Sequence, residues 1–171
     1  MMTAKIVILG DTHIRSFKEL PSEIIVELKD SDWIIHVGDF VSLDVLEGLM
    51  KLKGVRFKGV YGNADPKSIH DKLHSKEVFE ISGKKIGITH PATGGPIEVI
   101  KSKTLEIFKD EKVDIIVYGH THEPEIIYEG KILLINPGKG YLETEYFGPS
   151  TTIVILTLNQ ETNYKIKEII I

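Results

Sequence analysis

The first third of the chain alternates short apolar runs with amphipathic segments. Apolar runs that are rich in β-branched residues and end near glycine predict strands over residues 5–10, 33–39 and 55–63. Between them, residues 21–30 and 42–54 place apolar side chains at helical spacing, with Ser42 as a candidate cap and Gly54 as a stop. This alternation of strand and helix predicts a parallel sheet with right-handed crossover connections.

The remaining sequence contains more strands than helices. It predicts a hairpin over residues 77–90, turning at Ser82-Gly83, a helix over 95–112, and strands over 113–119, 125–136 (turning at Glu129-Gly130), 151–158 and 164–171. No linker rich in glycine, proline or serine, no low-complexity tract and no repeat interrupts the chain. We therefore expect one α/β domain over residues 1–171, with two β-sheets packed as a sandwich and flanked by α-helices.

The amino-acid composition limits the class of protein and the side chains that could bind a metal ion. The 171 residues are 42% hydrophobic and 27% charged, which is typical of a globular protein large enough to form a core without disulfides. There is no cysteine, so any metal ion would depend on His, Asp, Glu or Asn. A net charge of −4 argues against a general nucleic-acid binder. The sequence shows neither a signal-peptide pattern nor a membrane-spanning run, and we expect a cytoplasmic protein.

Polar side chains follow the ends of five predicted strands. The seven residues at these positions are Asp11, His13, Asp39, Asn63, His90, His120 and His122. At four of the five ends, glycine directly precedes the first of these residues. Because ligands of open α/β sheets bind in the crevice beyond the carboxyl ends of the strands, we expect the seven side chains to converge on one rim.

Each of these residues also has an ordinary structural explanation. Taken singly, Asp11, Asp39 and Asn63 fit turn or cap chemistry, and His13 and His90 fit loop positions. The histidine pair on either side of Thr121 is more specific, since residues two apart in an extended segment face the same way. Their joint occurrence at successive strand ends favours a common site.

The types of side chain indicate which ions would bind. Imidazole and carboxylate together suit Mn, Fe, Co, Ni or Zn, whereas Mg and Ca prefer oxygen ligands alone. Seven ligands are too many for one ion with an open position and suit two ions about 3.5–4 Å apart. An aspartate is a natural bridge because each of its two oxygens can bind one ion. We expect two divalent ions, with Mn²⁺ first and Ni²⁺, Co²⁺, Fe²⁺ and Zn²⁺ as alternatives.

The motifs "DTH", "GD", "GN", "TH" and "GHTH", in this order, resemble those of the calcineurin-like metallophosphoesterase superfamily. The short chain and the "NPG" at Asn136 to Gly138 resemble its small single-domain branch, the YfcE-like phosphodiesterases. The resemblance extends from Lys5 to about Gly138. It implies a double β-sandwich flanked by helices, in agreement with the hydrophobic pattern.

The resemblance also implies an activity and the roles of the site residues. One ion would be held by Asp11, His13, Asp39 and His122, and the second by Asp39, Asn63, His90 and His120. Asp39, Asn63 and His90 would be the catalytic residues. The implied reaction is hydrolysis of a small-molecule or nucleotide phosphodiester by a hydroxide that bridges the two ions.

Two other functions stay open, a phosphomonoesterase on the same site and a non-catalytic scaffold like the member of this fold in the retromer coat. A nuclease is disfavoured, because the chain has neither spare length nor a basic excess. We expect no membrane partner and no stable nucleic-acid binding. The β-rich C-terminal third is a candidate interface for a homodimer.

The sequence departs from the superfamily pattern in places. Ala64 occupies the position where protein phosphatases have a histidine that assists the leaving group, and Ala64-Asp65 fits the small phosphodiesterase branch. Because acid catalysis commonly contributes a factor of about 10²–10⁴, its absence favours esters with better leaving groups. Pro91-Ala92 follows His90 where relatives often carry glycine and then His or Asp, so a contact that supports a metal ligand, or one to the phosphate, is expected to be missing.

Several charged residues and histidines fall outside the motif set. Lys139 follows "NPG" where relatives commonly have serine; we interpret it, like Arg15, as a solvated side chain rather than a phosphate contact. His36 is expected to be buried and hydrogen-bonded to the backbone. His70 and His74 are spaced i, i+4 and would share a solvated helix face.

Overall fold

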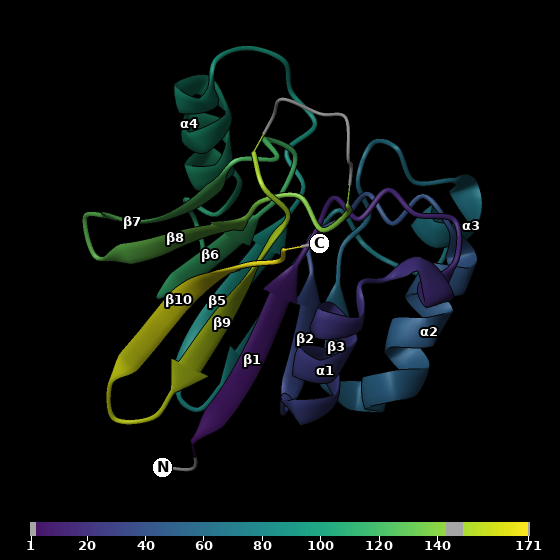
Figure 1. Cartoon of the computed structure of the whole chain (residues 1–171). Coiled ribbons are helices and arrows are strands. Elements are labelled where there is room, and N and C mark those ends of the chain that lie inside the picture. The colour runs from purple at the N-terminus through teal and green to yellow at the C-terminus, as the bar shows by residue number, and fades with distance from the viewer. Residues whose placement is uncertain (1–2, 143–148, 171) are drawn as a thin grey trace.

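A computed structural model describes residues 3–142 and 149–170 of the chain. Two mixed five-stranded sheets lie face to face, and helices cover their outer faces (Figure 1). The predicted α/β sandwich flanked by helices is therefore confirmed. None of the helices in the described part of the chain has the length and hydropathy needed to cross a membrane.

The first sheet has the strand order β10-β9-β1-β2-β3. Strands β1 (Ala4–Leu9), β2 (Trp33–His36) and β3 (Phe57–Gly59) run parallel, as their alternation with helices predicts. Strands β9 (Thr152–Leu158) and β10 (Thr162–Glu168) add antiparallel pairs. The connections between the parallel strands contain α1 (Ser22–Asp30) and α2 (Leu43–Lys53).

The second sheet has the order β4-β5-β6-β8-β7. Its strands are β4 (Lys76–Ile81), β5 (Lys84–Thr89), β6 (Ile115–Tyr118), β7 (Pro124–Glu129) and β8 (Ile132–Pro137). The β4–β5 hairpin turns at Ser82 and Gly83, whose φ values of 49° and 76° are those that a two-residue type I′ turn requires. The helix α4 (Ile97–Ile107) packs on the outer face of this sheet.

Alternating side chains of the central strands enter different hydrophobic layers. Ile6 and Ile8 of β1 face the second sheet and pack with Ile86 and Ile88 of β5. The intervening Val7, with Leu9, faces α1 and α2 in a second cluster. This period of two is what a sheet buried on both faces requires, and it explains why β1 is apolar on both faces from Ile6 to Leu9.

Some boundaries differ from those that the sequence predicts. The helix predicted over residues 95–112 spans only Ile97–Ile107, because Pro96 precedes its first turn as the N-cap and Phe108 ends it. The third strand is also shorter, because Gly54–Arg56 forms a 3₁₀ turn before Phe57. The helix α3 spans only Lys67–His70, so His74 lies beyond it and the two histidines do not share a helix face.

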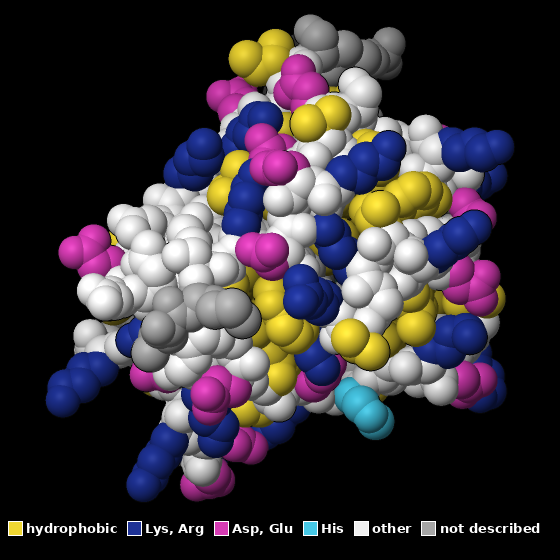
Figure 2. Space-filling model, turned by 90° about the horizontal axis from the view of Figure 1, so that it is seen from below, with side chains coloured by type: hydrophobic (Ala, Val, Ile, Leu, Met, Phe, Trp, Pro, Cys, Tyr) yellow, Lys and Arg dark blue, Asp and Glu magenta, His cyan; other side chains and the backbone are white. Residues whose placement is uncertain are grey.

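The carboxyl ends of the parallel strands of both sheets meet at one end of the sandwich (Figure 1). The opposite end of the molecule, seen from below, shows basic and acidic side chains interspersed and histidine nearly absent (Figure 2). The carboxyl ends of the parallel strands therefore define the rim that the sequence predicts.

Candidate metal centre

The loops that follow β1, β2 and β6 are joined by backbone contacts at the rim. The Asp11 N–H donates to the Gly38 carbonyl at 2.9 Å, and the His13 N–H donates to the Asp39 carbonyl at 3.1 Å. From the second sheet, the His120 N–H donates to Asp11 Oδ2 at 3.0 Å. These bonds place residues that are more than a hundred positions apart at the same point of the fold, so the predicted residues form one cluster.

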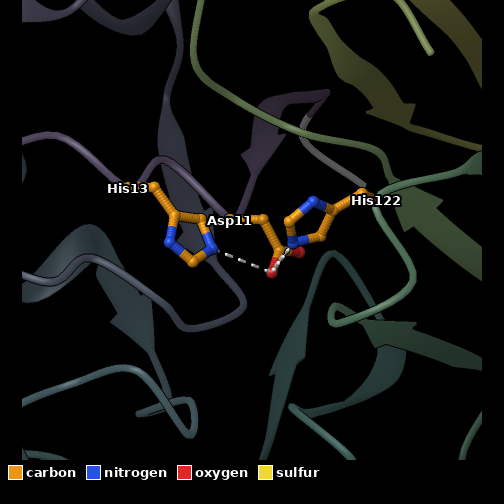
Figure 3. A group of neighbouring side chains, drawn as sticks. All are labelled: Asp11, His13 and His122. Carbon is orange, nitrogen blue, oxygen red and sulfur yellow. Dashed lines mark ion pairs between the residues drawn. The ribbon is translucent and has the colours of Figure 1, made fainter. Parts of the chain in front are cut away.

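Asp11, His13 and His122 form the first group of this cluster (Figure 3). Both imidazole rings face the Asp11 carboxylate, with His122 Nε2 at 3.2 Å and His13 Nε2 at 3.9 Å from Asp11 Oδ1. Asp11 is fully buried, whereas the two histidine side chains are about one third exposed, 29% for His13 and 32% for His122. The group is therefore anchored in the core and open to solvent on its histidine side.

Asp39 lies between the first group and the histidine that follows β5. Its Oδ2 is 3.4 Å from His13 Nε2 and also 3.4 Å from His90 Nε2. Its Oδ1 accepts the Ala64 N–H at 2.8 Å. We expected each oxygen to face a different ion; the geometry instead directs one oxygen, Oδ2, toward both sides, because the other is bound to the backbone.

Asn63 connects His90 with His120. Asn63 Oδ1 lies 3.1 Å from both His90 Nε2 and His120 Nδ1. The other nitrogen of each ring bonds to a backbone carbonyl, His90 Nδ1 to Val37 at 2.7 Å and His120 Nε2 to Thr93 at 3.2 Å. Since these nitrogens donate their protons to carbonyls, His90 Nε2 and His120 Nδ1 keep their lone pairs for a cation.

The buried carboxylates remain charged despite their burial. Burial favours the neutral form of Asp11, but the imidazoles of His122 and His13 outweigh it and hold its pKa below the ordinary value. The same balance, with His13 as the main partner, lowers the pKa of Asp39. In return, the carboxylates of Asp11 and Asp39 raise the pKa of His13 to about 9. The two carboxylates of the cluster thus favour positive charge beside them.

Two buried atoms of the cluster have no hydrogen-bond partner within the described residues. They are Asp11 Oδ1 and His13 Nε2, which face each other across the first group. Buried polar atoms in native proteins are nearly always paired, so such atoms need an explanation. A divalent cation would bind both, and the oxygen and imidazole donors around them suit a transition metal. The residues present therefore fit a metal centre.

Most of the cluster residues adopt a strained backbone conformation. Five of the seven have positive φ: Asp11 (46°), His13 (44°), Asp39 (58°), His120 (85°) and His122 (61°). Such values are uncommon outside glycine and concentrate at functional sites. Because the chain turns sharply here, consecutive polar side chains can point into one small volume.

Predictions for the charged residues and histidines outside the motif set had mixed outcomes. His36 is fully buried, as expected; its Nδ1 accepts the Gly38 N–H at 3.2 Å, and burial lowers its pKa to about 3. Arg15 is exposed, as expected. The prediction for Lys139 was wrong, because this residue is only 3% exposed and its Nζ lies 4.7 Å from the centre of the Tyr141 ring. His70 stacks on Tyr61, with ring centroids 3.9 Å apart.

Two residues at the rim were not assigned a role from the sequence. The Tyr141 ring lies edge-on to the histidines of the first group, 5.7 Å from His13 and 6.1 Å from His122. No sequence signal marks it, since it lies in a loop after β8. Asp65 accepts backbone N–H groups from the loops that bear Asp39 and Asn63. Its position after "GN" was the one available signal.

Comparison with known proteins agrees with this geometry. Residues 4–161 match the family model of the calcineurin-like phosphoesterase superfamily domain. A probable metallophosphoesterase of Methanocaldococcus jannaschii is 36% identical over 141 residues, covering 80% of this chain and 68% of the relative. A phosphodiesterase of the same organism, MJ0936, is 32% identical over 156 residues, covering 81% and 86%.

A solved structure of vacuolar protein sorting 29 from Cryptosporidium parvum has a similar fold. Its TM-score is 0.75 over 99% of both chains, with 20% sequence identity, so this likeness concerns the fold alone. The family model covers most of the chain, and the relatives cover it with at least 30% identity. This chain belongs to the calcineurin-like phosphoesterase superfamily and has small archaeal phosphodiesterases among its homologues.

Proposed function

We propose that this protein is a phosphodiesterase with a dinuclear metal centre. Asp11, His13, Asp39 and His122 hold one divalent ion, and Asp39, Asn63, His90 and His120 hold the other. The observation that supports this most directly is the position of Asp39 Oδ2, at 3.4 Å from one imidazole nitrogen on each side. The name of the MJ0936 relative, a phosphodiesterase, supports the substrate class.

The side chains divide the work of binding and orientation. Asp39 links the two halves of the centre, and the hydrogen bond from the Ala64 N–H to its Oδ1 keeps the carboxylate from turning away. His90 is fixed by the Val37 carbonyl with its Nε2 facing Asn63. Asn63 is exposed, so its amide N–H is available to donate to a substrate phosphate. Two divalent ions held here would polarise the phosphoryl oxygens and lower the pKa of water.

The surroundings of Ala64 favour an ester substrate with a good leaving group. The Ala64 side chain is a methyl group, and its backbone N–H is bound to Asp39 Oδ1 at 2.8 Å. This position therefore supplies no proton to a departing alkoxide. Because a poor leaving group depends on such a proton, phosphomonoesters of simple alcohols would be slow substrates.

The metal is expected to be Mn²⁺, with Ni²⁺, Co²⁺, Fe²⁺ and Zn²⁺ as alternatives. The mixed imidazole and carboxylate donors suit all of these ions better than Mg²⁺ or Ca²⁺. The protein geometry does not choose among them, because affinity and cellular supply both contribute.

The test compares hydrolysis of bis-p-nitrophenyl phosphate with that of p-nitrophenyl phosphate. Protein stripped with EDTA is assayed alone and after addition of each metal, with circular dichroism to verify folding. We expect metal-dependent cleavage of the diester in preference to the monoester, and loss of that cleavage in a folded Asp39→Asn variant. Preference for the monoester would make the protein a phosphomonoesterase. Folded protein that cleaves neither ester with any metal would contradict catalysis and favour a scaffold.

A further inference from the structure

Asp65 is a buried carboxylate that binds backbone rather than charged partners. It is 7% exposed and follows Asn63 and Ala64 in the chain. Its Oδ2 accepts the Asp39 N–H at 3.0 Å and the Gly62 N–H at 2.7 Å, and its Oδ1 accepts the Val41 N–H at 2.8 Å. One side chain thus satisfies three backbone donors.

These donors belong to the two loops that bear ligands of the proposed second ion. Asp39 and Val41 lie in the loop after β2, and Gly62 directly precedes Asn63 in the loop after β3. Asp39 and Val41 have φ values of 58° and 61°, which are unfavourable for residues with a side chain. Such a conformation persists only when surrounding contacts fix it, and the bonds to Asp65 are contacts of this kind.

A further hydrogen bond joins the two loops, and in this one the loop after β3 supplies the donor and Asp39 the acceptor. The Ala64 N–H, next to Asp65, donates to Asp39 Oδ1 at 2.8 Å. The backbone of Asp39 is therefore held by Asp65, and its carboxylate is held by the residue before Asp65. With Oδ1 engaged, Oδ2 is the oxygen directed toward His13 and His90.

We propose that Asp65 is a positioning residue that fixes Asp39 relative to Asn63 and so assembles the group for the second ion; this inference rests on the proposed dinuclear centre. Asp65 does not contact the ligand atoms of His90 or His120. A carboxylate is required here because three N–H donors from different directions need two acceptor oxygens. An asparagine would keep the shape but present an NH₂ group to a backbone donor.

The first experiment measures amide hydrogen exchange by NMR in protein without metal. In Asp65→Asn, we expect at least one of the amides of Asp39, Val41 and Gly62 to exchange about 10- to 100-fold faster than in the wild type, because an NH₂ group replaces one of the two acceptor oxygens. The matched control is Asp114→Asn. Asp114 also accepts a backbone N–H, that of Lys85 at 2.8 Å, but at the amino end of β6. This control should leave the three amides unchanged.

The second experiment titrates Mn²⁺ into the same proteins by calorimetry. The wild type should bind two ions per chain. Asp65→Asn should bind the second about 10- to 100-fold more weakly, the usual effect of losing a group that orients metal ligands, while the first ion is little affected. Asp65→Glu keeps the charge but displaces it by one methylene, and an intermediate loss is expected. This variant replaces Asp65→Asn if the latter does not fold.

The outcomes separate positioning from a purely structural role. If Asp65→Asn lowers only the melting temperature, with exchange at the three amides and both metal affinities as in the wild type, the proposal is overturned. A wild type that binds no ion would contradict the metal centre, and with it the positioning role, whereas the exchange data would still decide whether Asp65 holds the two loops together.

Discussion

Gly119, between β6 and His120, lies at a crowded point of the rim. A Cβ at this position would lie 2.6 Å from the Val37 carbonyl oxygen, 2.8 Å from His90 Nδ1 and 3.1 Å from Asp11 Oδ2. The first two distances are shorter than Cβ contacts in real proteins. Since the Val37 carbonyl and His90 Nδ1 bond to each other at 2.7 Å, the Gly119→Ala substitution must displace one of them and weaken the bond that orients His90.

The expected cost follows from this crowding. Overpacking of a well-packed region costs about 1–3 kcal/mol. Replacing glycine by alanine returns about 0.4–1 kcal/mol by restricting the unfolded chain. The difference of these two ranges is a net loss of about 0–2.6 kcal/mol, and its middle value of about 1.3 kcal/mol corresponds to a fall of about 3–5 °C in the melting temperature for a chain of this size. Because His90 is a proposed ligand, activity should fall about 10- to 100-fold, as when a group that orients a metal ligand is lost.

The assay pairs thermal unfolding of EDTA-treated protein with diester hydrolysis at saturating Mn²⁺. Gly94→Ala is the control, because a Cβ at Gly94 meets no atom within 4 Å. We expect Gly119→Ala to be less stable and less active than this control. If the two variants match in both melting temperature and turnover, the argument from crowding around His90 is refuted.

Three further outcomes are expected. His122→Ala should weaken the binding of one ion and remove most diesterase activity. It should not unfold the protein, because the His122 side chain is 32% exposed and contacts Asp11. Wild-type turnover in this variant would contradict the role of His122 as a metal ligand. Mn²⁺ at 100 times its Kd should stabilise the protein by about 2.7 kcal/mol per site. The melting temperature should therefore rise when Mn²⁺ is added and return to its starting value when EDTA removes the ion. No rise would contradict a preformed site. Glu27→Gln should cost about 1 kcal/mol at pH 7, because Glu27 pairs with Lys5 and Lys167, both at 2.9 Å. Lys5, and then Lys167, hold the pKa of Glu27 below its ordinary 4.5. This stabilisation is therefore complete above pH 4.5 and disappears as the pH falls through the pKa of Glu27 in the folded protein. If wild type and Glu27→Gln differ equally in their free energy of urea unfolding at pH 7 and at pH 3, the ion pairs are excluded as the source of the difference.

The sequence predicts the fold because its local signals agree with its tertiary structure. Short β-branched runs that end at glycine, such as the one within residues 5–10, favour buried strands, and the helices between them have clear end signals. The cluster residues follow from one topological rule, that polar side chains at the carboxyl ends of parallel strands converge. This rule places Asp11 beside His120 although 109 positions separate them.

The features that the sequence does not predict depend on contacts between distant loops. Lys139 is 3% exposed, with its Nζ 4.7 Å from the centre of the Tyr141 ring, and no local sequence pattern encodes this burial. The three bonds to Asp65 come partly from residues 24 and 26 positions earlier. Likewise, the hydrogen bond from the Ala64 N–H to Asp39 Oδ1 forms only because two loops approach each other. The sequence therefore does not predict that Oδ2 alone faces both His13 and His90.

The backbone strain in the loops of the rim requires that neighbouring parts of the fold hold these loops firmly. Five cluster residues with positive φ, at about 1–3 kcal/mol each, store a free energy comparable to the whole net stability of a typical domain. Metal binding would relieve the repulsion between Asp11 and Asp39 but not the backbone strain. The strained loops must therefore be held by protein contacts alone, among them the Val37 carbonyl, the Gly38 carbonyl and the Asp65 carboxylate. Since these contacts are made within the protein, they orient the ligand residues, and loosening any one of them should reduce metal affinity before it unfolds the chain.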